Sequence, residues 1–227
     1  MESPAAHRQS QTLGRHRLFA AAVFALAVSF VGLSTSAEAR TIRLVALGDS
    51  LTAGYGLNPG EAFPAVLEKA LKDKGFDVSI ANAGVSGDTA SAGAARVDWS
   101  VPDGTDGVIL ELGANDALRG LDPAGTDKAL RQALDRLKAR NIPVLLAGMY
   151  APRSLGAVYY EKFDAIYPKL ATDYGVDLYP FFLDGVAGDV KLNLPDGMHP
   201  TAEGIRTVVE RMLPTVESFL RRIQPPS

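Results

Sequence analysis

The sequence predicts a three-layer α/β domain in which a parallel sheet lies between two layers of helices. Short apolar runs rich in Val, Leu and Ile recur along the chain, as expected of strands that are buried on both faces. Segments whose apolar residues repeat at helical spacing separate these runs. Strands that alternate with helices imply right-handed crossovers, and such crossovers build a parallel sheet that is covered on both sides.

Five segments are predicted as strands. Three of them are almost entirely apolar, and the second and fifth are weaker candidates of the same kind. In chain order the five are residues 42–47, 78–80, 108–112, 144–147 and 176–179.

Helices are predicted between these strands and after the last one. The first has Pro64 near its start and Gly75 in position to end it with a left-handed turn. Residues 127–140 carry one apolar stripe, which is typical of a surface helix. The last helical stretch runs from about residue 201 to 220, and Pro214 is expected to kink or break it.

The first 39 residues have the layout of a signal peptide. Three arginines precede an uncharged apolar run of 16 residues, and Ala37-Glu38-Ala39 follows as a cleavage signal. The alternative is an uncleaved membrane anchor, but a helix that spans the hydrocarbon core needs about 20 apolar residues. We therefore expect cleavage near Ala39, a periplasmic or secreted protein, and one domain over residues 40–227, with no stable membrane span in the mature chain.

The composition of the mature chain excludes several functions. Removal of three arginines and two glutamates with the leader leaves 20 basic and 24 acidic side chains, and this acidic balance does not favour nucleic acid as a partner. The chain has no cysteine, so thiol catalysis and thiolate metal sites are excluded. A single histidine, His199, remains after the leader, which is too few imidazoles for a zinc hydrolase. We expect no cofactor and no metal, and oligomeric state is left open.

His199 is a candidate general base. It follows Asp196-Gly197-Met198 and precedes Pro200, which predicts a loop just before the final helix. An aspartate three residues away can accept a hydrogen bond from one ring nitrogen and so fix the tautomer in which the other nitrogen takes a proton. The alternative is that Asp196 and Thr201 only cap a helix and that His199 is a surface bystander.

Ser50 is the candidate nucleophile. The string Gly48-Asp49-Ser50-Leu51 ends the first predicted strand, and open parallel sheets bind ligands at that end of their strands.

Two further strings, which follow later predicted strands, contain candidate oxyanion donors. Gly87, before a helix that Asp88 or Ser86 is expected to cap, offers a backbone N–H to a developing oxyanion, and the Asn115 side chain offers a second donor. The alternative for each string is an ordinary turn, in which the polar side chains form hydrogen bonds with free backbone groups.

Taken together, these strings resemble the SGNH (GDSL) family of serine hydrolases. The four blocks that match in order are Gly48-Asp49-Ser50-Leu51, Gly87 in Ser-Gly-Asp, Gly-Ala-Asn115-Asp, and Asp196-Gly-Met-His199. The similarity extends over nearly the whole mature chain and is greatest to the bacterial periplasmic thioesterase, protease and lysophospholipase group, which includes arylesterases. Ala114, where glycine is common, and the loop of residues 150–158 depart from that pattern.

The resemblance implies a flavodoxin-like strand order of 2-1-3-4-5 and a role for each residue. Ser50 would be the nucleophile, His199 the base and Asp196 the group that orients it. The backbone amides of Ser50 and Gly87, together with Asn115, would form the oxyanion hole. The implied substrate is a small-molecule carboxylic ester (an aryl ester, a lysophospholipid or a short to medium acyl ester) or an acyl thioester.

Other classes of protein fit less well or differ only in substrate. An ordinary α/β-hydrolase needs Gly-x-Ser-x-Gly, and nucleotide-binding folds need glycine-rich phosphate loops, and the sequence lacks all of these. A non-catalytic binding module would be expected to lose one of the three catalytic positions. A carbohydrate O-deacetylase or an acyltransferase would use the same residues, so both stay open.

Overall fold

The computed structural model describes residues 40–223, which lie within one compact unit. Five strands form one parallel sheet in the order β2-β1-β3-β4-β5. The strands are β1 (Ile42–Gly48), β2 (Val78–Gly84), β3 (Gly107–Glu111), β4 (Val144–Ala147) and β5 (Asp177–Tyr179). The predicted fold class and strand order are confirmed.

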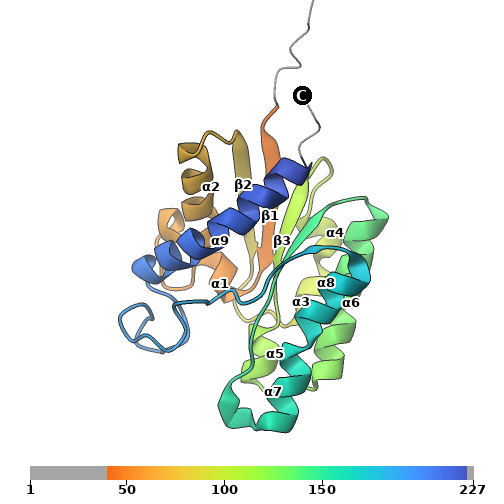
Figure 1. Ribbon diagram of the computed structural model, residues 1–227, viewed down its shortest axis with the longest axis vertical. Coiled ribbons are helices and arrows are strands. Elements are labelled where there is room, and N and C mark those ends of the chain that lie inside the picture. Colours follow the sequence, from red (N-terminus) through yellow and green to blue (C-terminus); the bar gives the residue numbers. More distant parts are fainter. Residues whose placement is uncertain (1–39, 224–227) are drawn as a thin grey trace, which may run out of the picture. The chain divides into compact units, whose positions relative to one another are not determined.

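Helices cover both faces of the sheet (Figure 1). On one face, α2 (Phe63–Asp73) packs against α9 (Ala202–Ile223). On the other face, α6 (Pro123–Ala139) contacts both α3 (Ala90–Ala95) and α8 (Ile166–Tyr174). The remaining helices are short: α1 (Ser50–Ala53), η1 (Pro59–Glu61), α4 (Val97–Ser100), α5 (Ala114–Leu118), η2 (Arg153–Leu155) and α7 (Ala157–Asp164).

The sheet determines where the predicted site segments that follow β1, β2 and β3 meet in space. β1 lies between β2 and β3, and Gly48 at its end is paired with Gly84 on one side and Glu111 on the other. The chain leaves β1 toward one face of the sheet and leaves β3 toward the other, which makes this the topological switch point of the fold. The loops that follow β1, β2 and β3 therefore surround one crevice.

The core is built from the predicted apolar runs. Every residue of β3 and β4 is buried, as expected of central strands that are covered on both faces. Large aromatic side chains complete the packing, and Phe163, Tyr167 and Phe182 are almost fully buried.

Two local predictions need correction. The helix predicted over residues 127–140 begins earlier, at Pro123, because Asp122 caps it by accepting a hydrogen bond from the Ala124 amide and proline suits a first helical turn. Thr89, rather than Asp88 or Ser86, caps α3 and accepts from the Ala92 amide.

Pro214 lies inside α9 and does not end it. A proline cannot donate to the carbonyl four residues earlier, which here belongs to Glu210. Both Pro214 and Glu210 are exposed, so water can satisfy the freed carbonyl. The helix therefore continues to Ile223.

The predicted signal peptide lies outside the described residues. Within residues 40–223, no helix combines the length and the apolar character that a membrane-spanning helix requires.

Candidate active site

Ser50 is the first residue of α1 and lies two positions after the end of β1. Asp49 caps α1 by accepting a hydrogen bond from the Leu51 amide at 3.0 Å. The preceding Gly48 has no room for a side chain, because a Cβ there would lie 2.1 Å from the Thr52 hydroxyl and 2.7 Å from Glu111. This close packing holds the Ser50 side chain at the floor of a cavity.

Hydrogen bonds join the side chains of Ser50, His199 and Asp196 in the structure. The Ser50 Oγ lies 2.9 Å from Nε2 of His199, although the two residues are 149 positions apart in the sequence. On the other side of the ring, Nδ1 lies 2.7 Å from an oxygen of Asp196. The three side chains form one hydrogen-bonded chain in which the imidazole can accept a proton from the serine.

Asp196 is held ionised by its surroundings. Its carboxylate accepts hydrogen bonds from the backbone amides of His199 and Met198, at 3.0 and 2.9 Å, in addition to the bond with the imidazole. The His199 amide is the largest influence, followed by the Met198 amide, and together with the imidazole they lower the pKa of Asp196 to about 2. A permanent negative charge therefore faces Nδ1 of His199.

The ring of Tyr55 packs against the imidazole from the solvent side. The two ring centroids lie 4.5 Å apart with an interplanar angle of 35°. This contact restrains the orientation of the imidazole ring. Tyr55 was not singled out in the sequence, because nothing in the string Ala-Gly-Tyr-Gly indicates which side chain it contacts.

The backbone amides of Ser50 and Gly87 are candidate donors to an oxyanion. Ser50 and Gly87 both line the cavity, and neither amide takes part in the turn and loop hydrogen bonds of the described chain. Gly87 has a φ of +88°, a left-handed conformation that favours glycine. Such unpaired N–H groups are suited to binding an oxyanion.

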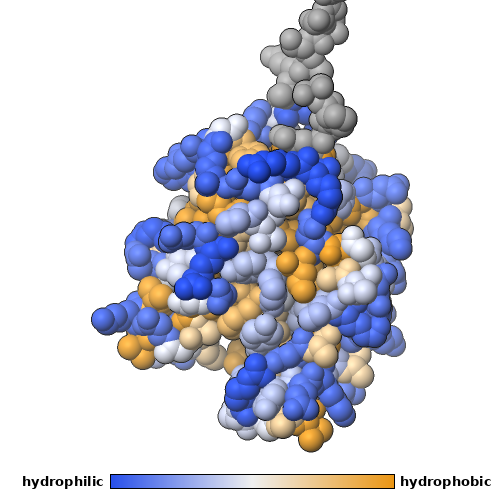
Figure 2. Space-filling model, in the orientation of Figure 1, coloured by the Kyte–Doolittle hydropathy of each residue, from blue (hydrophilic) through white to orange (hydrophobic). Residues whose placement is uncertain are grey.

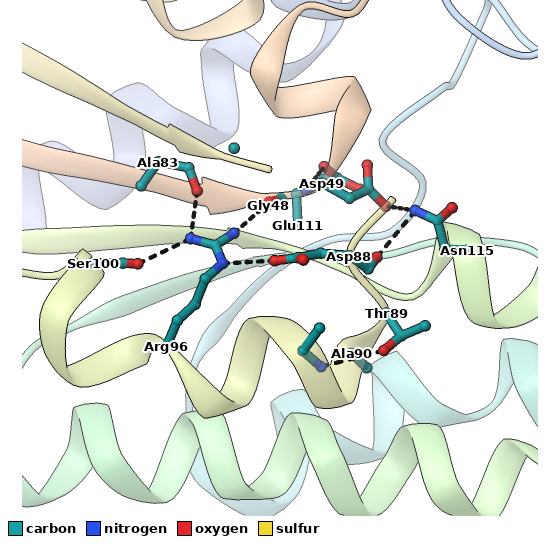
Figure 3. Close-up of polar contacts among 12 residues, drawn as sticks. Gly48, Asp49, Ala83, Asp88, Thr89, Ala90, Arg96, Ser100, Glu111 and Asn115 are labelled. Atoms are coloured by element: carbon teal, nitrogen blue, oxygen red, sulfur yellow. Dashed lines mark hydrogen bonds and ion pairs between the residues drawn. The ribbon is translucent and has the colours of Figure 1, made fainter. Parts of the chain in front are cut away.

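Asn115 lies beside these amides, but its own N–H groups already have partners. Its Nδ2 donates to the Asp49 carboxylate at 3.2 Å and to the Asp88 carbonyl at 3.0 Å (Figure 3). Donation to an oxyanion would require the longer of these two bonds, the one to Asp49, to be shared or exchanged.

A buried pair of carboxyl groups lies behind the Ser50 turn. Asp49 and Glu111 are both fully buried, and Glu111 accepts hydrogen bonds from the Thr52 hydroxyl at 2.8 Å and the Asp49 amide at 3.4 Å. Burial raises the pKa of Asp49 to about 6. Burial, and then the neighbouring Asp49 charge, raise the pKa of Glu111 well above its usual range, so Glu111 is the member of the pair that keeps its proton.

The cavity in front of Ser50 has a volume of about 830 Å³. It runs from the His199 ring past residues 149–153, the loop after β4 in which the sequence departs from the family pattern, to Phe181 and Leu183. Its rim carries exposed apolar side chains, namely Leu118, Tyr150 and Met198. Figure 2 shows a hollow at the lower edge of the molecule, with hydrophobic and pale residues along its upper side and mainly hydrophilic residues on the lobe below it. The cavity is therefore suited to an apolar group.

Metal-binding residues do not gather at the site. Within residues 40–223, no group of three or more His, Asp or Glu side chains has a geometry that could hold a metal ion.

Sequence reasoning missed Glu111, Arg96 and Tyr55. Glu111 could have been identified from the sequence, because it is the one charged residue of an otherwise apolar strand and follows Val108-Ile109-Leu110. Arg96 follows a helix of small residues and carried no such signal.

The chain is similar to known hydrolases over most of its length. Residues 46–206 match the GDSL-like Lipase/Acylhydrolase family. Thioesterase 1/protease 1/lysophospholipase L1 of Escherichia coli K12 is 40% identical over 77% of this chain and 83% of that protein. Esterase TesA of Pseudomonas aeruginosa is 35% identical over 85% of this chain and 96% of its own.

A solved structure is similar as well. The crystal structure of AlinE4, an SGNH-hydrolase family esterase, superimposes with a TM-score of 0.68 at 47% identity, and the match covers 80% of this chain and 97% of AlinE4. The four sequence blocks, the strand order and these similarities agree, and the chain belongs to the GDSL-like lipase/acylhydrolase family.

Proposed function

We propose that the protein is a serine ester hydrolase that forms an acyl intermediate on Ser50. The observation that carries this proposal is the hydrogen-bonded chain from the Ser50 hydroxyl through His199 to Asp196, which opens onto an apolar cavity. The esterases and thioesterases among the relatives support the same class of reaction.

In the proposed first step, Nε2 of His199 accepts the proton of Ser50 as the serine oxygen attacks the acyl carbon. The Asp196 carboxylate keeps the other ring nitrogen protonated and stabilises the imidazolium. The carbonyl oxygen becomes an oxyanion, which accepts hydrogen bonds from the amides of Ser50 and Gly87 and from Asn115. His199 then gives its proton to the leaving oxygen or sulfur, and the bond to the acyl group breaks.

In the second step, water attacks the acyl-Ser50 ester. His199 accepts a proton from that water and afterwards returns one to Ser50, which releases the carboxylic acid. The cycle consumes one water molecule per ester, and no cofactor enters it.

The cavity supports an apolar acyl or aryl group as the substrate. Its volume of about 830 Å³ lies within the usual range for small-molecule sites, roughly 300–1,000 Å³. Each CH₂ that the cavity removes from water is worth about 0.8 kcal/mol, or about fourfold in kcat/KM, until the chain outgrows the site. We propose aryl esters, lysophospholipids and short to medium acyl esters as substrates, with acyl thioesters as a further class.

Two alternatives use the same residues. A carbohydrate O-deacetylase needs polar groups to bind its sugar, whereas this cavity is lined mainly by apolar side chains such as Met149, Phe181 and Leu183. An acyltransferase would let an alcohol or a lysolipid, rather than water, capture the acyl group.

One experiment separates these classes. Wild-type protein and a Ser50→Ala variant are assayed with p-nitrophenyl esters of increasing chain length, an acetylated sugar, an acyl thioester and a lysophospholipid. We expect kcat/KM to rise from acetyl to medium-chain esters and to vanish in the variant. A preference for the acetylated sugar would favour the deacetylase, and acyl transfer to added alcohol faster than hydrolysis would favour the transferase.

We further propose that residues 1–39 are a signal peptide and that the mature enzyme is periplasmic or secreted. The support is the arginine-rich start, the apolar run of 16 residues and the Ala37-Glu38-Ala39 cleavage signal. Mass spectrometry of protein recovered from periplasmic extract and culture medium should find an N-terminus at Arg40. Recovery of the full-length chain alone would contradict cleavage.

A further inference from the structure

Arg96 is a buried arginine at the junction of α3 and α4, on the side of the sheet that faces α6. It is 5% exposed and has four hydrogen-bond partners (Figure 3). Its Nε donates to the Asp88 carboxylate at 2.6 Å, and its Nη2 donates to the Gly48 carbonyl at 2.8 Å. Its Nη1 donates to the Ala83 carbonyl at 2.8 Å and the Ser100 hydroxyl at 3.0 Å.

These partners belong to the segments that carry the reaction centre. Gly48 is the last residue of β1, two positions before Ser50. Ala83 lies at the end of β2. Asp88 directly follows Gly87, which lines the cavity. One guanidinium group therefore joins the strand that delivers the nucleophile to the loop that delivers an oxyanion donor.

The loop around Gly87 has few other restraints. The Asp88 carbonyl accepts from Asn115 at 3.0 Å, and the Gly87 carbonyl accepts from the exposed side chain of Arg119 at 3.0 Å. The Asp88 amide donates to the Val85 carbonyl within the loop itself. The Val85 amide also donates to the Gly48 carbonyl at 3.0 Å. Arg96 adds a side-chain link, because one guanidinium group donates both to the Asp88 carboxylate and to the Gly48 carbonyl at the end of β1.

We propose that Arg96 is a positioning residue that holds the Gly87 amide in register with Ser50. The inference rests on the proposed function, because it assigns the Gly87 amide to the oxyanion. Arg96 does not touch the substrate. It acts through Asp88 and Gly48, and its loss lets the Gly87 amide move away from the oxygen that it must bind in the transition state.

The hydrogen bonds of this site require arginine, and another cationic side chain cannot replace it. Four acceptors lie around the guanidinium group, and its planar fork of five N–H donors serves all of them at once. A lysine ammonium has three donors that diverge from one point, so it can keep the charge beside Asp88 but cannot also reach both carbonyls in the same geometry.

The test compares Arg96→Lys with the wild-type enzyme on a medium-chain p-nitrophenyl ester. Active sites are first counted by the burst of p-nitrophenol from a p-nitrophenyl phosphonate that reacts with Ser50. Loss of one oxyanion donor costs roughly 10²- to 10³-fold in kcat, so a displaced donor should cost about 10- to 100-fold per active site. KM should change by no more than about twofold, since the ground-state ester depends little on the oxyanion hole.

A second readout distinguishes positioning from folding. An alkyl boronic acid adds to a serine hydroxyl as a tetrahedral mimic of the transition state, and its inhibition constant should rise by the same factor as kcat falls. If the substitution only impairs folding, fewer active sites react with the phosphonate, while kcat per active site and the inhibition constant stay unchanged.

A second variant guards against failure to fold. The pair Arg96→Met with Asp88→Asn removes the ion pair as a unit and leaves no unpaired buried charge. It should lose at least as much kcat per active site as Arg96→Lys. The matched control is Arg140→Met with Asp103→Asn, because Arg140 also donates to a backbone carbonyl and an aspartate, but ahead of β3 at the opposite end of the sheet. The control should keep its kcat per site.

The outcomes separate the two proposals. Wild-type kcat per site and inhibition constant in Arg96→Lys, or in the double variant if the lysine variant does not fold, would overturn the role of Arg96. Equal losses in the Arg140 control would do the same. Hydrolysis that persists in Ser50→Ala, without a phosphonate burst, would instead overturn the proposed function itself.

Discussion

Replacement of Glu111 tests whether the buried carboxyl group behind Ser50 is neutral. Glu111 is fully buried, and burial together with the Asp49 charge raises its pKa well above the usual range. A neutral glutamic acid is close in shape and charge to glutamine. We therefore expect Glu111→Gln to fold and to stay active, whereas Glu111→Ala should be strongly destabilised.

The hydrogen bonds that Glu111 accepts determine how much stability Glu111→Ala should lose. In Glu111→Ala, the buried Thr52 hydroxyl loses an acceptor at 2.8 Å, and the Asp49 amide loses a weaker one at 3.4 Å. A buried donor left unpaired costs about 1–3 kcal/mol, so the two together should lower the free energy of unfolding by about 2–4 kcal/mol. Glutamine still offers an oxygen to Thr52 and should cost less than about 1 kcal/mol at neutral pH.

The pH dependence gives the sharper test. A carboxyl group whose pKa is raised in the folded state stabilises the protein at low pH, and that stability is lost as the pH rises above the ordinary glutamate pKa toward the folded one. Glutamine does not titrate, so Glu111→Gln should gain stability relative to wild type between pH 5 and pH 9. Asp49, with its pKa raised to about 6, contributes the same trend to both proteins.

The assay is urea denaturation, followed by circular dichroism, of wild type, Glu111→Gln and Glu111→Ala at several pH values in that range. The reasoning would be refuted if Glu111→Gln were as unstable as Glu111→Ala at pH 8, because Glu111 would then be ionised in the folded protein. A constant difference between wild type and Glu111→Gln from pH 5 to pH 9 would also contradict the raised pKa.

Three further predictions concern the reaction. Asn115→Ala should lower kcat roughly 10²- to 10³-fold in a folded protein, since it removes one oxyanion donor, and an unchanged kcat would remove Asn115 from the site. Asp196→Asn should lower kcat roughly 10³- to 10⁴-fold, because an amide N–H facing Nδ1 of His199 favours the tautomer that cannot accept the serine proton; a loss below tenfold in steady-state assays would argue against the orienting role. Ala187→Phe places a ring in the apolar cavity, so the ratio of kcat/KM for the decanoyl ester to that for the acetyl ester should fall at least tenfold, and an unaltered ratio would show that the acyl chain lies elsewhere.

Much of the fold could be predicted from local patterns, but the strand order could not. Apolar runs marked β3 and β4 clearly, because a strand that is buried on both faces is apolar throughout. The edge strand β2 is partly exposed and extends to Gly84, beyond the predicted residues 78–80. The same property makes any such strand a possible neighbour of any other, so the order 2-1-3-4-5 followed only from the family resemblance. Helix boundaries were less certain, as the early start of α6 at Pro123 shows.

The site was predictable to the extent that its residues lie in short strings. Five site residues were named from the sequence. The structure places Ser50, Gly87, Asn115 and His199 around one cavity and Asp196 against the His199 ring, while the catalytic roles of all five stay predictions.

The groups behind them were not predictable, because their function depends on contacts between distant segments. Arg96 meets Gly48 across 48 positions of sequence, and Asp49 meets Glu111 across 62. The engagement of both Asn115 hydrogens likewise appears only when three loops are placed together.

The position of His199 so late in the chain has a consequence for biosynthesis. The imidazole is carried by the loop that leads into α9, and α9 must dock beside α2 before that loop can reach Ser50. A nascent chain that has completed all five strands of the sheet still lacks His199, the residue proposed as the base. Hydrolytic activity therefore begins with the last helix, and ester cleavage reports that the whole domain has been made and assembled.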